Sequence, residues 1–224
     1  MGDLPRRTVT AIVYGAVVLL ALLAPAVVFW ALLAVIAVLA IGELVRLHTG
    51  SSAVAVGALF VVGLVSLGIL RWLGPYGAHH GIAGQLPVWL LMVLVPTWAA
   101  DVAAYVAGST IGRRKLAPRI SPGKTWEGTL AGFVACAIVA FGVGATFGLG
   151  RLLVVVIAIG LGPVGLAGDL SKSYVKRRAG VKDSGTLLPG HGGIVDRLDS
   201  TVAGAPFVLV CVWLASLGAL GGLG

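Results

Sequence analysis

Acidic residues recur at the places where this largely apolar chain becomes charged, and their spacing can bring several carboxylates together. Asp196 and Asp199 are three positions apart, so they share a face of any helix that contains both. Asp169 ends an earlier apolar run. Three carboxylates at one level suit a hard, oxygen-seeking cation such as Mg²⁺. The alternative is that each acid pairs with a nearby Lys or Arg and serves folding alone.

Basic residues crowd the same part of the chain. The stretch KRRAGVKDSGTLLPGHGGIVDRLDS, residues 176–200, holds eight of the 24 charged residues. A second basic stretch, RRKLAPRISPGKTWEG, covers residues 113–128. Cationic side chains beside carboxylates are typical of a nucleotide-phosphate site, where metal and cations together neutralise the phosphates. Ordinary basic loops at one face of a membrane are the alternative interpretation.

The run Gly123-Lys124-Thr125 does not form a P-loop, because that motif requires Gly at position 118, where Pro stands, and a preceding strand, which we do not expect. We predict instead that Ser121 and Pro122 cap a helix whose first turn contains Glu127. The N–H groups of such a helix start can receive phosphate.

Composition indicates a polytopic membrane protein. The chain of 224 residues is 58% hydrophobic and 11% charged, with a mean hydropathy of +1.05. We predict an all-α fold of about seven transmembrane helices, each near the roughly 20 residues needed to cross a bilayer. The spans cover about 8–24, 26–47, 51–73, 86–110, 127–148, 150–171 and 195–222. Spans one to three form an N-terminal part, 1–90. The rest, 91–224, holds the candidate site residues, and we expect it to be the catalytic part if the chain is an enzyme, with loops 111–126 and 171–195 on its cytoplasmic side.

The distribution of Lys and Arg predicts the orientation of these spans. With the N-terminus inside, 14 of the 16 basic residues fall on the cytoplasmic side, and only Arg71 and Arg151 fall outside. The C-terminus is then external. Asp101 lies within the fourth span, and an intramembrane acid is a functional candidate by default. The net charge of +8 in this setting favours anionic lipid and phosphate over nucleic acid.

Four segments carry a resemblance to a known family. From Ser173 the sequence SYVKRRAGVKDSGTLLPGHGGIVDRLD resembles the signature of the phosphatidate cytidylyltransferases, also called CDP-diacylglycerol synthases. SPGKTWEG at 121–128 is similar to the family's Ser-Pro-Lys-Lys-Thr-x-Glu-Gly block, with Gly123 in place of a frequent Lys. DVAAYVAG at 101–108 and GDLSKSYVKR at 168–177 resemble two further family segments. The resemblance covers about residues 97–200, whereas the first 90 residues match only in hydrophobicity.

The resemblance implies an enzyme that joins CTP and phosphatidate into CDP-diacylglycerol and pyrophosphate with Mg²⁺, at the cytoplasmic face of the inner (plasma) membrane. It implies catalytic roles for a set of residues in the signature, namely Asp169, Lys176, Lys182, Asp183, His191 and Asp196. The implied substrate-binding residues are Ser121, Lys124, Thr125, Lys172, Ser173, Arg177, Gly192, Gly193 and Arg197. The implied metal ligands are Asp169 and Asp196, with Asp199, Asp101 and Glu127 in or near the metal site.

Other functions stay open at this point. An ion-coupled transporter would explain Asp101 but not the long charged stretch, and another membrane-embedded phospholipid or polyprenol phosphotransferase or kinase would share its phosphate chemistry. The sequence leaves open the acyl-chain preference, a homodimeric assembly and the identity of a second cation. It also leads us to expect that Asn at position 169 or 196 leaves folding unharmed or improves it, because a cluster of like charges is relieved.

Overall fold

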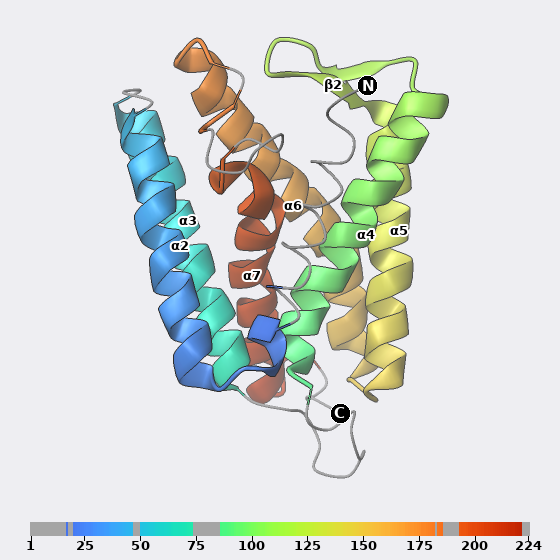
Figure 1. Cartoon of the computed structure of the whole chain (residues 1–224). Coiled ribbons are helices and arrows are strands. Elements are labelled where there is room, and N and C mark those ends of the chain that lie inside the picture. Colours follow the sequence, from blue (N-terminus) through green and yellow to red (C-terminus); the bar gives the residue numbers. More distant parts are fainter. Residues whose placement is uncertain are drawn as a thin grey trace.

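The protein is a bundle of long apolar helices with a small β-hairpin at one end (Figure 1). The computed structural model describes residue 17, residues 20–46, 50–73, 86–181, 183–185 and 193–220. In this part of the chain, six helices are long and apolar enough to cross a membrane. They are α2 (Ala26–Arg46), α3 (Ser51–Trp72), α4 (Val88–Thr110), α5 (Trp126–Thr146), α6 (Arg151–Arg178) and α7 (Val195–Ser216). Six of the seven predicted spans are thus confirmed, and the first, about 8–24, falls largely outside the described residues.

The helices form three neighbouring pairs. α2 and α3 lie on one side of the bundle, α4 and α5 on the other, and α6 and α7 lie between them (Figure 1). The α4–α5 contact is close because Gly128 and Gly132, four residues apart, face α4: a Cβ at these positions would lie 2.6 Å from the carbonyl oxygen of Ala104 and 2.9 Å from that of Ala100. Small residues at this spacing let two membrane helices approach backbone to backbone.

α6 extends farther than the sequence predicted. The predicted span ended near residue 171, but the helix continues to Arg178, and 28 residues measure about 42 Å, more than a hydrocarbon core of about 30 Å. No Gly or Pro interrupts residues 169–178, and Gly180, with φ 72°, follows the end of the helix in a left-handed conformation. The first part of the predicted loop 171–195 is therefore two further helical turns, which carry Lys172, Ser173, Lys176 and Arg177.

The predicted helix cap at Ser121-Pro122 is wrong. Residues Ser121–Thr125 form strand β2, which pairs antiparallel with β1 (Lys115–Ala117) in the register Lys115 to Thr125 and Ala117 to Ser121. Pro118 opens the turn between the strands, where its fixed φ suits the second position. The cap of α5 is Thr125, whose Oγ1 accepts a hydrogen bond from the Gly128 N–H at 3.2 Å.

The charged residues of the described chain gather at the end of the bundle that carries the hairpin. The C-terminal ends of α2, α4 and α6 and the start of α5 all lie there, and the α5–α6 connection lies at the opposite end (Figure 1). Of the described Lys and Arg residues, only Arg71 and Arg151 belong to the opposite end. This separation matches the predicted grouping of basic residues, while the side of the membrane that each end faces remains a prediction.

Candidate active site

Three carboxylates of α6 and α7 converge on one lysine. Lys172, one turn after Asp169 on α6, is only 6% exposed. Its Nζ lies 3.4 Å from Asp169 Oδ1 and 3.5 Å from Asp196 Oδ1, and it also forms an ion pair with Asp199 Oδ2. The three acids that the sequence placed at one membrane depth are therefore brought together, with an ammonium group between them.

Two more lysines complete an alternating cluster of charges. Lys176, one turn beyond Lys172, places its Nζ 2.6 Å from Asp196 Oδ1. Lys124, on β2, places its Nζ 2.6 Å from Asp169 Oδ2 and so ties the hairpin to α6. Three lysines face three aspartates, so the cluster is balanced in charge. The expectation that Asn substitutions relieve like-charge repulsion neglected these lysines, because loss of one carboxylate leaves a lysine without its partner.

Asp196 also holds the segment that precedes α7. While its Oδ1 faces the lysines, its Oδ2 accepts hydrogen bonds from Ser184 N and Ser184 Oγ, both at 2.9 Å, and from Gly193 N at 3.2 Å. The two oxygens of one carboxylate thus serve different partners. Ser173 Oγ adds a long hydrogen bond of 3.5 Å to Asp169 Oδ1.

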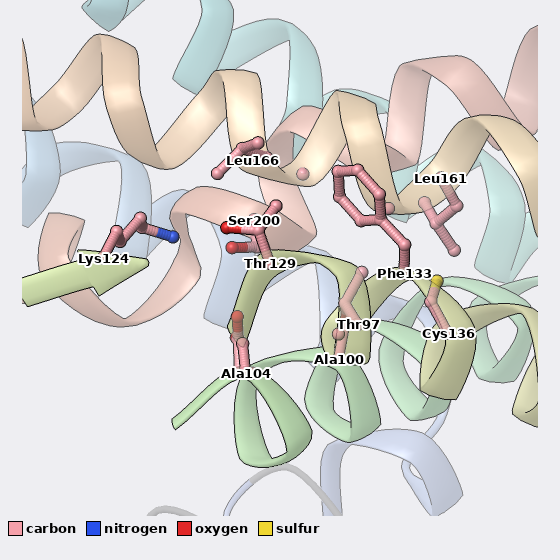
Figure 2. A pocket seen from close by; sticks show the side chains of 14 residues that line it. Thr97, Ala100, Ala104, Lys124, Thr129, Phe133, Cys136, Leu161, Leu166 and Ser200 are labelled. Atoms are coloured by element: carbon pink, nitrogen blue, oxygen red, sulfur yellow. The ribbon is translucent and has the colours of Figure 1, made fainter. Parts of the chain in front are cut away.

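A small cavity of about 40 Å³ opens beside this cluster between α4, α5, α6 and α7. Figure 2 shows Lys124 pointing toward the side of the cavity where the hydroxyls of Thr129 and Ser200 lie, with Phe133 and Leu161 farther along the bundle. Asp101 also lines the cavity, so it reaches the site from α4 without joining the carboxylates around Lys172. The space has room for about one or two water molecules, and Asp101, Lys124, Thr129 and Ser200 offer polar groups at its wall.

The remaining predicted residues of the hairpin serve its shape. Glu127 does not join the other acids: its Oε2 accepts hydrogen bonds from the backbone N–H groups of Arg113, at 3.1 Å, and Arg114, at 3.3 Å. Ser121 pairs within the two-stranded sheet and Thr125 caps α5. These residues fix the place of Lys124 on β2.

Arg177 links the hairpin to the last turn of α6. Its Nε donates to the carbonyl oxygen of Ile120 at 3.2 Å, and its Nη1 donates to that of Val181 at 3.2 Å. Asp183 and Arg197 are exposed. The predicted residues Lys182, His191 and Gly192 lie outside the described residues.

Sequence reasoning missed two residues next to the cluster, Ser184 and Glu43. Ser184 lies inside the recognised signature, but Ser is common in loops and gave no separate signal. Glu43 did give a signal in the sequence. It is a lone carboxylate near the end of an otherwise apolar span, where a charge is costly unless it has a hydrogen-bond or ion-pair partner.

The chemical type of the possible metal ligands fits a hard divalent cation, because Asp169, Asp196 and Asp199 offer carboxylate oxygens. In the described part of the chain, however, no three His, Cys, Asp or Glu side chains are grouped so that they alone could hold a metal ion. The carboxylate oxygens converge instead on the Lys172 ammonium. A metal ion at these oxygens would compete with Lys172 for them.

Comparison with known proteins identifies the family of the chain. The sequence profile of the cytidylyltransferase family matches residues 79–215, more than half of the chain. The chain therefore belongs to the cytidylyltransferase family.

Several curated relatives carry one and the same name. The chain is 37% identical over 155 residues to a phosphatidate cytidylyltransferase of Haemophilus influenzae, covering 66% of this chain and 51% of that protein. It is 39% identical over 133 residues to a phosphatidate cytidylyltransferase of Pseudomonas aeruginosa, covering 58% and 49%. It is 42% identical over 153 residues to one of Brucella suis, covering 66% and 52%. The chain thus spans about half the length of the curated relatives that it matches.

Proposed function

We propose that the protein transfers a cytidylyl group from CTP to phosphatidate and so forms CDP-diacylglycerol and pyrophosphate. The observation that carries the proposal is the cluster in which Lys124, Lys172 and Lys176 alternate with three aspartates at the charged end of the helices. Membership of the cytidylyltransferase family and the names of the relatives support the choice of nucleotide and lipid.

The chemistry needs positioning and charge neutralisation more than a strong base. A phosphate oxygen of phosphatidate attacks the α-phosphorus of CTP, the bond between the α-phosphorus and the bridging oxygen breaks, and pyrophosphate leaves with the electron pair. A phosphate monoester is already an anion at neutral pH, so no residue must first remove a proton. The ammonium groups of Lys124, Lys172 and Lys176 neutralise charge on the phosphates as the bond breaks, which is the dominant contribution in phosphoryl transfer.

Mg²⁺ belongs to this proposal as the cation that Asp169, Asp196 and Asp199 would hold. When bound, it would supply a Lewis acid for the phosphate oxygens. Lys172 would then be released from the carboxylates and become available to a phosphate of the substrate.

An apolar cavity supports the choice of a lipid substrate. About 290 Å³ of space lies between α2, α3, α4 and α7, walled by residues such as Leu33, Leu64 and Leu94. Arg197, next to Asp196 in sequence, lines the same cavity. An acyl chain in this cavity would bring the phosphate of phosphatidate to the start of α7, with the cation of Arg197 close by.

The cytoplasmic face of the inner membrane is the proposed location of the site. CTP is a cytosolic nucleotide and phosphatidate a membrane lipid, so an enzyme that joins them must work at the membrane surface. The concentration of basic residues at the end with the hairpin agrees with a cytoplasmic position.

The decisive experiment uses the purified chain in liposomes that contain phosphatidate. With CTP and Mg²⁺ we expect pyrophosphate release and the formation of a liponucleotide, and neither product in liposomes that lack phosphatidate. Turnover that requires ATP rather than CTP, or that proceeds without phosphatidate, would contradict the proposal. Removing Mg²⁺ with a chelator should abolish turnover.

A further inference from the structure

Glu43 is the only acidic residue of α2, and it lies near the charged end of the bundle. It is only 6% exposed. Its Oε1 accepts a hydrogen bond from Ile194 N at 2.9 Å, and its Oε2 accepts from Val195 N at 3.1 Å and from Ser184 Oγ at 3.1 Å. All three donors belong to residues 184–195, which lie more than 140 positions away in the chain.

Two of these donors are the backbone N–H groups of the N-cap residue of α7, Ile194, and of its first residue, Val195. The first N–H groups of a helix have no acceptor within the helix, and they carry the positive end of its dipole. The N-cap residue of α7 is Ile194, which has no side chain able to cap. The Glu43 carboxylate takes this role from a different helix, so it fixes the position at which α7 begins.

The third donor, Ser184 Oγ, connects Glu43 to the charged cluster of three lysines and three aspartates. Ser184 Oγ lies 3.1 Å from Glu43 Oε2 and 2.9 Å from Asp196 Oδ2, so one hydroxyl lies between two carboxylates. Its single proton can serve only one of them at a time. The backbone N–H of Ser184 binds Asp196 at 2.9 Å independently of that proton.

The surrounding backbone leaves room for this carboxylate. A Cβ at Gly185 would lie 2.7 Å from Glu43 Oε1, and a Cβ at Gly193 would collide with both Glu43 and Ser184 Oγ. Side chains at these two positions would therefore displace Glu43, and the two glycines allow the segment before α7 to approach it.

We infer that Glu43 is a positioning residue for Asp196. It holds the start of α7 and Ser184, and these two in turn hold the carboxylate that binds Lys176 and approaches Lys172. The inference rests on the proposed function, since that proposal places Asp196 among the residues that act on the substrate phosphates. A displacement of about 1 Å at a reacting centre can lower a rate by about a hundredfold, so loss of this anchor is expected to appear in turnover.

The test compares Glu43→Gln and Glu43→Ala with Ser66→Ala. Glu43→Gln keeps the shape of the side chain and one oxygen acceptor, so it remains informative if Glu43→Ala fails to fold. The control removes a similarly buried hydroxyl of α3 that, among the described residues, bonds only to Val62 of its own helix. In hydrogen–deuterium exchange, peptides that cover residues 193–199 should exchange faster in the Glu43 variants than in the wild type. In Ser66→Ala their exchange rate should be unchanged.

Turnover supplies the second measurement. In the Glu43 variants kcat should fall about ten- to a hundredfold while KM for CTP changes less than about threefold, because the anchor acts on the placement of Asp196 rather than on binding. Adding Ser184→Ala to Glu43→Gln should cost less than the product of the two single effects, because both act through Asp196.

The outcomes separate the two proposals. Unchanged exchange at residues 193–199 would overturn the anchor, and faster exchange with unchanged kcat would reduce Glu43 to a purely structural role and overturn the positioning role. A wild-type protein that makes no liponucleotide from CTP would contradict the proposed function. The exchange comparison would still decide whether Glu43 holds the start of α7.

Discussion

Lys172 on α6 and Asp199 on α7 form an ion pair at the centre of the charged cluster, and two further carboxylates face the same ammonium. The side chain of Lys172 is 7% exposed, so the pair is shielded from water. A buried ion pair contributes little relative to apolar packing, but removal of one partner leaves the other charge buried and uncompensated. We therefore expect Lys172 to contribute to the stability of the α6–α7 contact and, under the proposed function, to the charge that a substrate phosphate would meet.

Replacement of Lys172 by Met should destabilise the protein strongly. Three carboxylates would lose their shared cation, and breaking such a buried pair costs about 3–5 kcal/mol. Thermal unfolding in detergent should show a melting temperature lowered by several degrees, and Asp199→Asn in the same chain should restore part of it. The matched control is Lys115→Met on β1, which is exposed. Equal melting temperatures for Lys172→Met and the control would show that the cluster does not contribute to folding.

Asp169→Asn and Asp196→Asn should each lower turnover by about a hundredfold or more, because each removes an anion that orders the lysines and would bind Mg²⁺. The double variant should be hardly worse than the poorer single variant, since residues that act as a unit fail together. Asp196→Asn should also lower the melting temperature, because Lys176 would keep its charge without its partner.

The control for the two Asn variants is Ser171→Ala, at an exposed position of α6. Within the described part of the chain, its hydroxyl bonds only to Ala167 of the same helix. Either variant retaining most of its turnover at saturating Mg²⁺ would remove that residue from the site. A melting temperature of Asp196→Asn at or above that of the wild type would restore the simpler expectation of relieved repulsion.

Leu33→Trp should reveal whether the apolar cavity takes an acyl chain. Leu33 is 6% exposed and lines the cavity, so an indole there would fill part of the space. We expect KM for phosphatidate to rise about tenfold with KM for CTP unchanged, because only binding of the lipid is impaired. Val38→Trp, on the same helix at a position 70% exposed, is the control and should leave both constants unchanged. Equal effects of the two substitutions would place the acyl chain elsewhere.

Cysteine labelling tests the orientation of the bundle. In a background with Cys136 and Cys211 replaced by Ala, a cysteine at Gly123 of β2 should react with a membrane-impermeant maleimide only after cells are permeabilised. A cysteine at Arg151, at the opposite end of the bundle, should react in intact cells. The reverse pattern would place the charged cluster on the external face and exclude direct access to cytosolic CTP.

The family and most of the membrane helices could be predicted from the sequence, because both depend on local patterns. A run of about 20 apolar residues has one stable arrangement in a bilayer, so the bounds of α2, α3 and α4 were placed within two residues. The i, i+3 spacing put Asp196 and Asp199 on one face of α7, and the signature put Asp169 near them. The end of α6 was placed wrongly because a charged helix that leaves the membrane has the same composition as a loop.

Tertiary structure alone decided how these residues are paired. Lys124 reaches Asp169 only because residues 121–125 form a strand instead of the predicted helix cap. Glu127, which the resemblance placed in or near the metal site, is held by the backbone of residues 113 and 114. Glu43 meets the start of α7 across more than 140 positions of sequence. Local patterns fix which segments are helical, but such partners depend on how the helices pack, and packing is set by long-range contacts that no short stretch of sequence contains.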